Sequence, residues 1–202
     1  MNYINKGYVV ISSDDNRYAR KILEKYPNYR GIDRYSWPIC DKDLKEIKGI
    51  SESEKSELIL SWQQLDRLLE TEIFCTDFSL VQDYVKLCNV LHINVEVLAC
   101  EICDDKPTEL CSDNMEYEWL GYDYGMQGAF YSCIVQEKEL IDTVEKIELN
   151  KNGLLRDFED TKKFANLREQ AKKKYNDNGF EYGQAGVDFH AIALFRCVGK
   201  EI

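Results

Sequence analysis

The chain has 202 residues, of which 44% are hydrophobic and 12% aromatic, and its formal net charge is −11 at pH 7. This length suits one folded domain, and the apolar content is high enough to exclude a wholly disordered chain. The negative charge disfavours nucleic acid and anionic membrane surfaces as ligands, because it repels polyanions.

The first part of the chain predicts a strand, a helix and a long connection. Residues 7–12 are apolar and β-branched, which indicates a buried strand. A helix should begin near Asp14 and end at Pro27, since proline lacks the backbone N–H that a helix needs. Residues 28–51 have no regular periodicity, so we expect an extended connection packed over the core.

Two amphipathic helices and two strands are expected next. Apolar residues recur at helical spacing over residues 53–69, with Ser53 as the expected cap, and again over residues 78–91. A short strand is expected over residues 72–76. Residues 93–100 alternate with the period of two that a strand requires.

The last part predicts a hairpin, a strand, a helix and a central strand. Residues 117–135 form the hairpin, with a turn at Gly125-Met126-Gln127-Gly128, because glycine permits the backbone angles of such turns. A strand over 144–149 and a helix over 155–175 follow. The expected buried stripe of this helix consists of Phe164, Leu167, Ala171 and Tyr175. Residues 188–198 are apolar on both faces, as in a central strand.

This order of elements predicts a single α+β domain over residues 1–202. A mixed or antiparallel sheet of about five to seven strands should be packed by about four helices. The N-terminal residues do not resemble a secretory signal, and no stretch approaches the ~18 apolar residues of a membrane span. We therefore expect a cytoplasmic location.

Eight cysteines are present, and outside an oxidising compartment they are expected to be reduced thiols. Cys100, Cys103 and Cys111 have a spacing that could supply three zinc ligands, with His92 or Cys133 as the fourth. A structural zinc site usually contains two paired ligand motifs, and only one pair is present here. The main expectation is therefore no metal and no cofactor, with a cysteine-dependent metal-binding protein or thiol enzyme as the alternative.

Only two histidines are present, so imidazole chemistry would have to use His92 or His190. His190 lies on the expected central strand and could in principle activate Cys40 or Cys75. No nucleophile motif surrounds either thiol, and a packed, hydrogen-bonded histidine is the simpler expectation. The common glycine-rich phosphate-binding motifs are absent, which disfavours ATP and NAD enzymes.

Negative charge is concentrated in the middle of the chain. Residues 51–150 contain 22 acidic and 6 basic side chains. Within them the acidic segment, Glu96–Asp123, contains nine carboxylates and one lysine, Lys106. Such a segment should attract a cationic protein, although acidic residues can also serve solubility alone.

The acidic segment runs into the hairpin, where carboxylates and aromatic side chains alternate. Glu116, Glu118 and Asp123 are expected to face water, and Trp119 could either anchor an interface or belong to the core. The predicted contact surface for a partner consists of Asp104, Asp105, Glu109, Asp113, Glu116, Glu118, Tyr122, Asp123 and Tyr124.

The hairpin stretch EWLGYDYGMQGAFYSCI is similar to segments of small acidic bacterial proteins of unknown function and of immunity proteins from polymorphic or contact-dependent toxin systems. The resemblance implies a non-enzymatic protein that occludes a basic toxin or nuclease domain by presenting carboxylates where phosphates would lie. The cysteine-dependent protein described above and a non-catalytic oligomeric accessory or phage-encoded protein are the alternatives.

Overall fold

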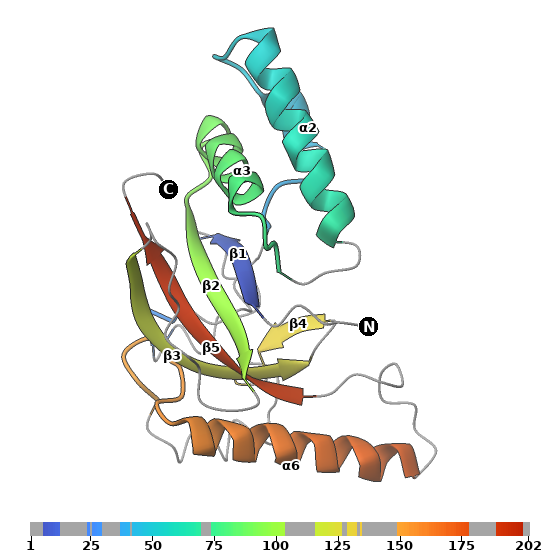
Figure 1. Ribbon diagram of the computed structural model, residues 1–202, viewed down its shortest axis with the longest axis vertical. Helices are drawn as coiled ribbons and strands as arrows, with labels where there is room; N and C mark the ends of the chain where they lie inside the picture. Colours follow the sequence, from blue (N-terminus) through green and yellow to red (C-terminus); the bar gives the residue numbers. More distant parts are fainter. Residues whose placement is uncertain are drawn as a thin grey trace.

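An antiparallel β-sheet with helices at two opposite ends organises the protein (Figure 1). The computed structural model describes residues 6–12, 24, 26–29, 37–40, 42–69, 74–103, 116–126, 129–132, 134, 149–177 and 189–199. In chain order the elements are β1 (Lys6–Ser12), the short 3-10 helix η1 (Asp43–Glu46), α2 (Glu52–Leu69), α3 (Phe78–Val90), β2 (Val95–Cys103), β3 (Glu116–Met126), β4 (Ala129–Ser132), α6 (Phe158–Asp177) and β5 (Phe189–Val198).

The sheet has the strand order β1-β2-β5-β3-β4, and each neighbouring pair is antiparallel. The α+β class is therefore confirmed, with the antiparallel form of the sheet. Within the described residues there are five strands, which lies within the predicted range of about five to seven, and three α-helices, one fewer than the predicted number of about four. Most of the helix expected from Asp14 and the strand expected before Leu149 lie outside the described residues.

β5 is the middle strand, as its apolar composition predicted. Its residues Ala191 to Leu194 are all at most 2% exposed, because both faces of the sheet are covered there. β2 begins two residues later than expected and extends to Cys103, with seven consecutive buried residues. Together with β3, these two strands form the inner part of the sheet.

The helices cover different ends of the sheet. α2 packs against α3, and α3 contacts β1, whereas α6 contacts β3 and β5 at the opposite end (Figure 1). None of the helices in the described part of the chain is both long and apolar enough to cross a membrane.

Side-chain caps determine where α2 and α3 begin. Ser53 was the expected cap of α2, but the Ser51 hydroxyl accepts the Glu54 N–H at 3.2 Å and the helix begins at Glu52. That cap prediction is wrong by two residues, because either serine precedes the apolar run at a suitable distance. α3 is capped by the Asp77 carboxylate, which accepts the N–H of Ser79 at 2.9 Å.

α6 differs from its prediction at its start and in its buried stripe. It begins at Phe158, and Asp157 accepts the N–H groups of Glu159 and Asp160 at 2.8 and 3.1 Å. Leu167 was expected to be buried and is 41% exposed, so this part of the prediction is wrong. Phe164 is buried as expected, and the other buried residues of the helix are Phe158, Thr161 and Ala165.

The predicted hairpin is present, but its strands are used unequally. β4 pairs with β3 only at Gly125 and Met126, which are strand residues rather than turn residues. The remainder of the predicted turn lies outside the described residues. β3 pairs along nearly its whole length with β5, so β5 and not β4 is its main partner, and β4 is a short strand at the edge of the sheet.

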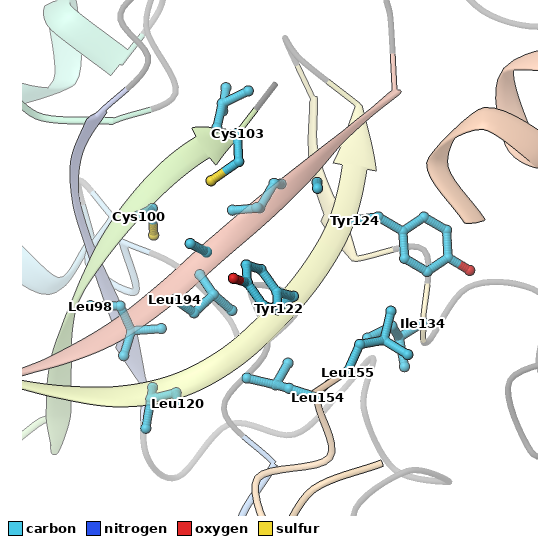
Figure 2. Close-up of a cluster of buried hydrophobic side chains, with 14 of the residues drawn as sticks. Leu98, Cys100, Cys103, Leu120, Tyr122, Tyr124, Ile134, Leu154, Leu155 and Leu194 are labelled. Carbon is cyan, nitrogen blue, oxygen red and sulfur yellow. The ribbon is translucent and has the colours of Figure 1, made fainter. Parts of the chain in front are cut away.

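A bulge between Trp119 and Gly121 bends β3, and the segment that follows Leu149 holds it in place. The Leu120 carbonyl accepts the side-chain amides of Asn150 at 2.6 Å and Asn152 at 2.9 Å. Two backbone hydrogen bonds of 2.9 Å join Tyr122 to Leu155. Leu120, Leu154 and Leu155 belong to a buried cluster of hydrophobic side chains (Figure 2).

Candidate functional site

The predicted contact surface is only partly visible. Asp104, Asp105, Glu109 and Asp113 lie outside the described residues. Glu116 is exposed at the start of β3, as expected. The Glu118 side chain is 40% exposed, but it is held in ion pairs with Arg196 at 2.9 Å and Lys151 at 3.8 Å.

Two further carboxylates of the acidic segment are also paired. The Arg196 guanidinium on β5 lies 3.5 Å from Glu96 on β2, so one cation joins three adjacent strands. Lys6 lies 3.0 Å from Glu101. At these carboxylates the described part of the acidic segment therefore carries less free negative charge than its sequence suggests.

The hairpin residues Tyr122, Asp123 and Tyr124 are buried, with exposed fractions of 8%, 0% and 0%. Asp123 was expected to face water, and that expectation is wrong. β3 has β5 on one edge and the Leu155 segment on the other, and both faces are covered at this point. These side chains belong to the core and do not form a contact surface.

Tyr124 illustrates why the alternation of aromatic and acidic residues was misleading. Its ring projects from β3 toward α6 (Figure 2) and stacks on Phe164 at a centroid distance of 5.8 Å. The Asp123 carboxylate is turned to the backbone and accepts the N–H of Tyr124 at 2.8 Å. Local hydrogen bonding thus compensates part of the cost of burying this acid.

The cysteines do not form a metal site in the described part of the chain. Cys100 and Cys103 are buried, and the Cys103 thiol donates to the Glu101 carbonyl oxygen at 3.3 Å. Burial raises the pKa of the Cys100 thiol well above its ordinary value, which opposes thiolate formation. Among the described residues no group of three or more metal-binding side chains is found. Cys111 and Cys133 lie outside those residues.

The geometry does not support a catalytic pair between His190 and Cys75. Cys75 bridges to Tyr8 on β1, which lies in register with Ala99 and then with Phe195. Phe195 is five residues along β5 from His190, roughly 17 Å in an extended strand. Cys40, the other candidate nucleophile for His190, is an exposed residue.

A continuous row of aromatic side chains crosses the sheet and is the most distinctive feature of the described surface. Its members, from the start of α3 to the start of α6, are Phe78, Tyr8, Tyr117, Phe195, Trp119, Tyr122 and Phe158. We call this set the aromatic row.

The strand register explains why these residues share one face. Tyr8, Ala99, Phe195 and Trp119 are direct cross-strand partners on β1, β2, β5 and β3. Ala99 contributes only a methyl group in the middle of this line. The larger rings on both sides can therefore lean toward each other over it.

Consecutive members of the row are in contact. Phe78 and Tyr8 have ring centroids 4.8 Å apart, and the Tyr8 and Tyr117 hydroxyl oxygens are 3.2 Å apart. The Tyr117–Phe195 and Phe195–Trp119 centroid distances are 6.4 and 4.8 Å.

The row continues from Trp119 to the start of α6. The Trp119–Tyr122 centroid distance is 4.7 Å, and the Tyr122–Phe158 distance is 5.8 Å. Such tilted and edge-on pairs are the preferred geometries of aromatic rings. The row thus links the first residue of α3 to the first residue of α6.

The aromatic row is buried near α6 and open in its middle. Trp119 is 41% exposed, one of the few large hydrophobic side chains with this much surface. Tyr8, Tyr117 and Phe195 are partly exposed. Burial and the hydrogen bond with Tyr117 raise the pKa of the Tyr8 phenol, so it stays neutral and can donate or accept a hydrogen bond.

Groups of both signs lie near the α6 end of the row, where the Lys162 ammonium nitrogen is 5.6 Å from the centroid of the Phe158 ring. Burial raises the pKa of the Tyr122 phenol, and the nearby acidic groups Cys103, Asp157 and Glu101 raise it further. Of these groups only the Asp157 carboxylate would stabilise a positive charge brought close to the ring, because the Cys103 thiol is a hydrogen-bond donor and Glu101 is already paired with Lys6. Aromatic faces also attract cations through their quadrupole.

Sequence reasoning found only part of this surface. Trp119 was considered as an interface anchor, but Tyr8, Tyr117 and Phe195 were not linked to it. The alternation of Tyr117 and Trp119 along one strand was a usable signal, because residues two apart share a face. The pairing of that strand with β5 and the proximity of Tyr8 depend on contacts between distant segments.

Comparisons of the chain with models of known protein families, with curated proteins and with solved structures gave no match.

Proposed function

We propose that this chain is an acidic, non-enzymatic binding protein, an immunity-type inhibitor that occludes a basic toxin or nuclease domain. The observation that carries the proposal is a partly exposed row of aromatic side chains, with Trp119 41% exposed, on a chain of net charge −11. Aromatic anchors contribute binding energy at protein interfaces, and a field of opposite sign accelerates association with a basic protein.

The two features act at different stages of binding. The net charge accelerates the encounter with a cationic domain, and this effect falls as salt screens it. The aromatic side chains bury apolar area after contact and slow dissociation. Because Glu96, Glu101 and Glu118 are already paired with Arg196, Lys6 and Lys151, the contact itself depends more on the rings than on these acids.

The proposal is tested by co-expression of this chain with basic toxin and nuclease domains. Protection of growth, together with loss of nuclease activity when the purified proteins are mixed, is the expected result. A mixture in which the domain keeps full activity and elutes separately in size-exclusion chromatography contradicts the proposal. Self-association of the chain without binding would favour the oligomeric accessory protein instead.

A further inference from the structure

We propose that the open part of the aromatic row, formed by Tyr8, Tyr117, Phe195 and Trp119, is the docking surface for an extended, arginine-bearing segment of a protein partner. This inference rests on the proposed function, since it names the chemistry of the partner that this surface would bind. Three features favour this partner: the dimensions of the row, the net negative charge of the chain and the chemistry of the rings.

The dimensions suit an extended segment. The row crosses from β1 to β3, which are separated by three inter-strand spacings, or roughly 14 Å. An extended chain covers this distance with about four or five residues. Side chains at alternate positions of such a segment point to the same side, about 7 Å apart, so two arginines could reach neighbouring rings.

The net negative charge of the chain favours a cationic partner over a polyanion. A sheet face with exposed aromatic rings can also stack nucleic-acid bases. Binding of this kind needs basic groups along the phosphate backbone, whereas this chain has a net charge of −11. The negative charge of the chain would therefore repel a single-stranded nucleic acid and attract an arginine-bearing peptide.

The chemistry of the rings favours arginine over lysine. The guanidinium group is planar, stacks on aromatic faces and is less strongly hydrated than an ammonium group. The paired Tyr8 and Tyr117 hydroxyls, 3.2 Å apart, can also accept a hydrogen bond from a guanidinium beside them. A lysine peptide of equal charge should use only the general electrostatic attraction.

The direct test follows the tryptophan indole N–H signals by NMR. The chain contains three tryptophans, and a Trp119→Phe variant assigns the signal of Trp119. The probes are a peptide of about eight residues with arginine at alternate positions, its lysine counterpart and a single-stranded DNA oligonucleotide of similar length. We expect the arginine peptide to shift the Trp119 signal at lower concentration than the lysine peptide, and the DNA to leave it unchanged.

Matched variants separate a specific surface from general charge attraction. Trp119→Ala should weaken arginine-peptide binding by roughly fivefold or more. Leu167→Ala removes a side chain of equal fractional exposure on α6 and should leave the affinity unchanged. If Trp119→Ala lowers the melting temperature, Trp119→Leu keeps an apolar side chain without an aromatic face and should show the same loss of binding.

Three results would overturn the inference: an unmoved Trp119 signal, equal affinities of the Trp119→Ala and Leu167→Ala variants, or tighter binding of the DNA than of the arginine peptide. Failure of this inference is distinguishable from failure of the proposed function. Growth protection that survives Trp119→Ala would refute the docking surface alone. Specific peptide binding at Trp119 without any protection would refute the inhibitor function alone.

Discussion

Asn150 should be one of the most sensitive polar residues in the protein, because it fixes the bulge that follows Trp119. Its side-chain amide donates to the Leu120 carbonyl at 2.6 Å, and its side-chain oxygen accepts the N–H groups of Asn152 at 2.8 Å and Leu154 at 3.2 Å. Replacing Asn150 with alanine removes all three hydrogen bonds.

The expected loss in free energy of unfolding follows from these three hydrogen bonds. Each hydrogen bond contributes about 0.5–1.5 kcal/mol net, so Asn150→Ala should lower the free energy of unfolding by about 2–3 kcal/mol. In a chain of this length that corresponds to a decrease in melting temperature of roughly 5–10 °C. Lys151→Ala is the matched control: its side chain is 76% exposed and lies 3.8 Å from Glu118, a pair worth at most about 0.5 kcal/mol.

Urea unfolding followed by tryptophan fluorescence measures both variants, and the slope of the transition should not change. An Asn150→Asp variant adds a second check. A carboxylate oxygen would face the Leu120 carbonyl, which raises the carboxyl pKa in the folded state, so the destabilisation at pH 7 should shrink as the pH falls and the group protonates. An Asn150→Ala variant as stable as Lys151→Ala would refute the reasoning that these hydrogen bonds hold the bulge.

Three other perturbations follow from single contacts. Gly121 has a φ of 141°, and a Cβ there would lie 2.6–2.9 Å from neighbouring atoms. Gly121→Ala should therefore lower the free energy of unfolding, measured with urea, by about 3 kcal/mol or more. Gly49→Ala is the control: a Cβ there meets open space, and the expected loss is about 1 kcal/mol. Asp77→Ala should cost about 1 kcal/mol at pH 7 by removing the cap of α3. The hydrogen bond from the Ser79 hydroxyl holds the pKa of Asp77 below its usual value. The difference in stability between the wild-type chain and Asp77→Ala should therefore be full at neutral pH and vanish as the pH falls through the folded-state pKa. Acid titration of both proteins tests this. Alkylation followed by peptide mapping should label the exposed Cys40 rapidly in the folded protein and Cys88 only after unfolding, since burial raises the pKa of Cys88 to about 12; equal labelling rates would contradict the burial of Cys88.

The sequence contained enough information to predict the elements with strong periodicity. β5 was recognised as central because both of its faces are apolar, and α3 because its apolar residues follow the helical period. These signals are local, and a helix or strand with one strongly apolar face has few alternatives. The location of the cap of α2 was missed because Ser51 and Ser53 offer nearly equivalent local chemistry.

The candidate surface depended on information that no local pattern contains. Tyr8 and Tyr117 are 109 residues apart and meet only because β1, β2, β5 and β3 pair in that order. Asp123 was expected to be exposed because charged residues are seldom buried, whereas in the fold it is 0% exposed on a strand paired with β5. Strand order and register therefore decide which of the aromatic and acidic residues are accessible.

The most direct test of the central claim is the dissociation constant of the complex with a basic toxin or nuclease domain, measured by calorimetry for the wild-type chain and for the Trp119→Ala and Leu167→Ala variants. The account predicts at least about tenfold weaker binding for Trp119→Ala, less than a twofold change for Leu167→Ala, and weaker binding of all three proteins at higher salt. Equal dissociation constants for the three proteins would contradict it.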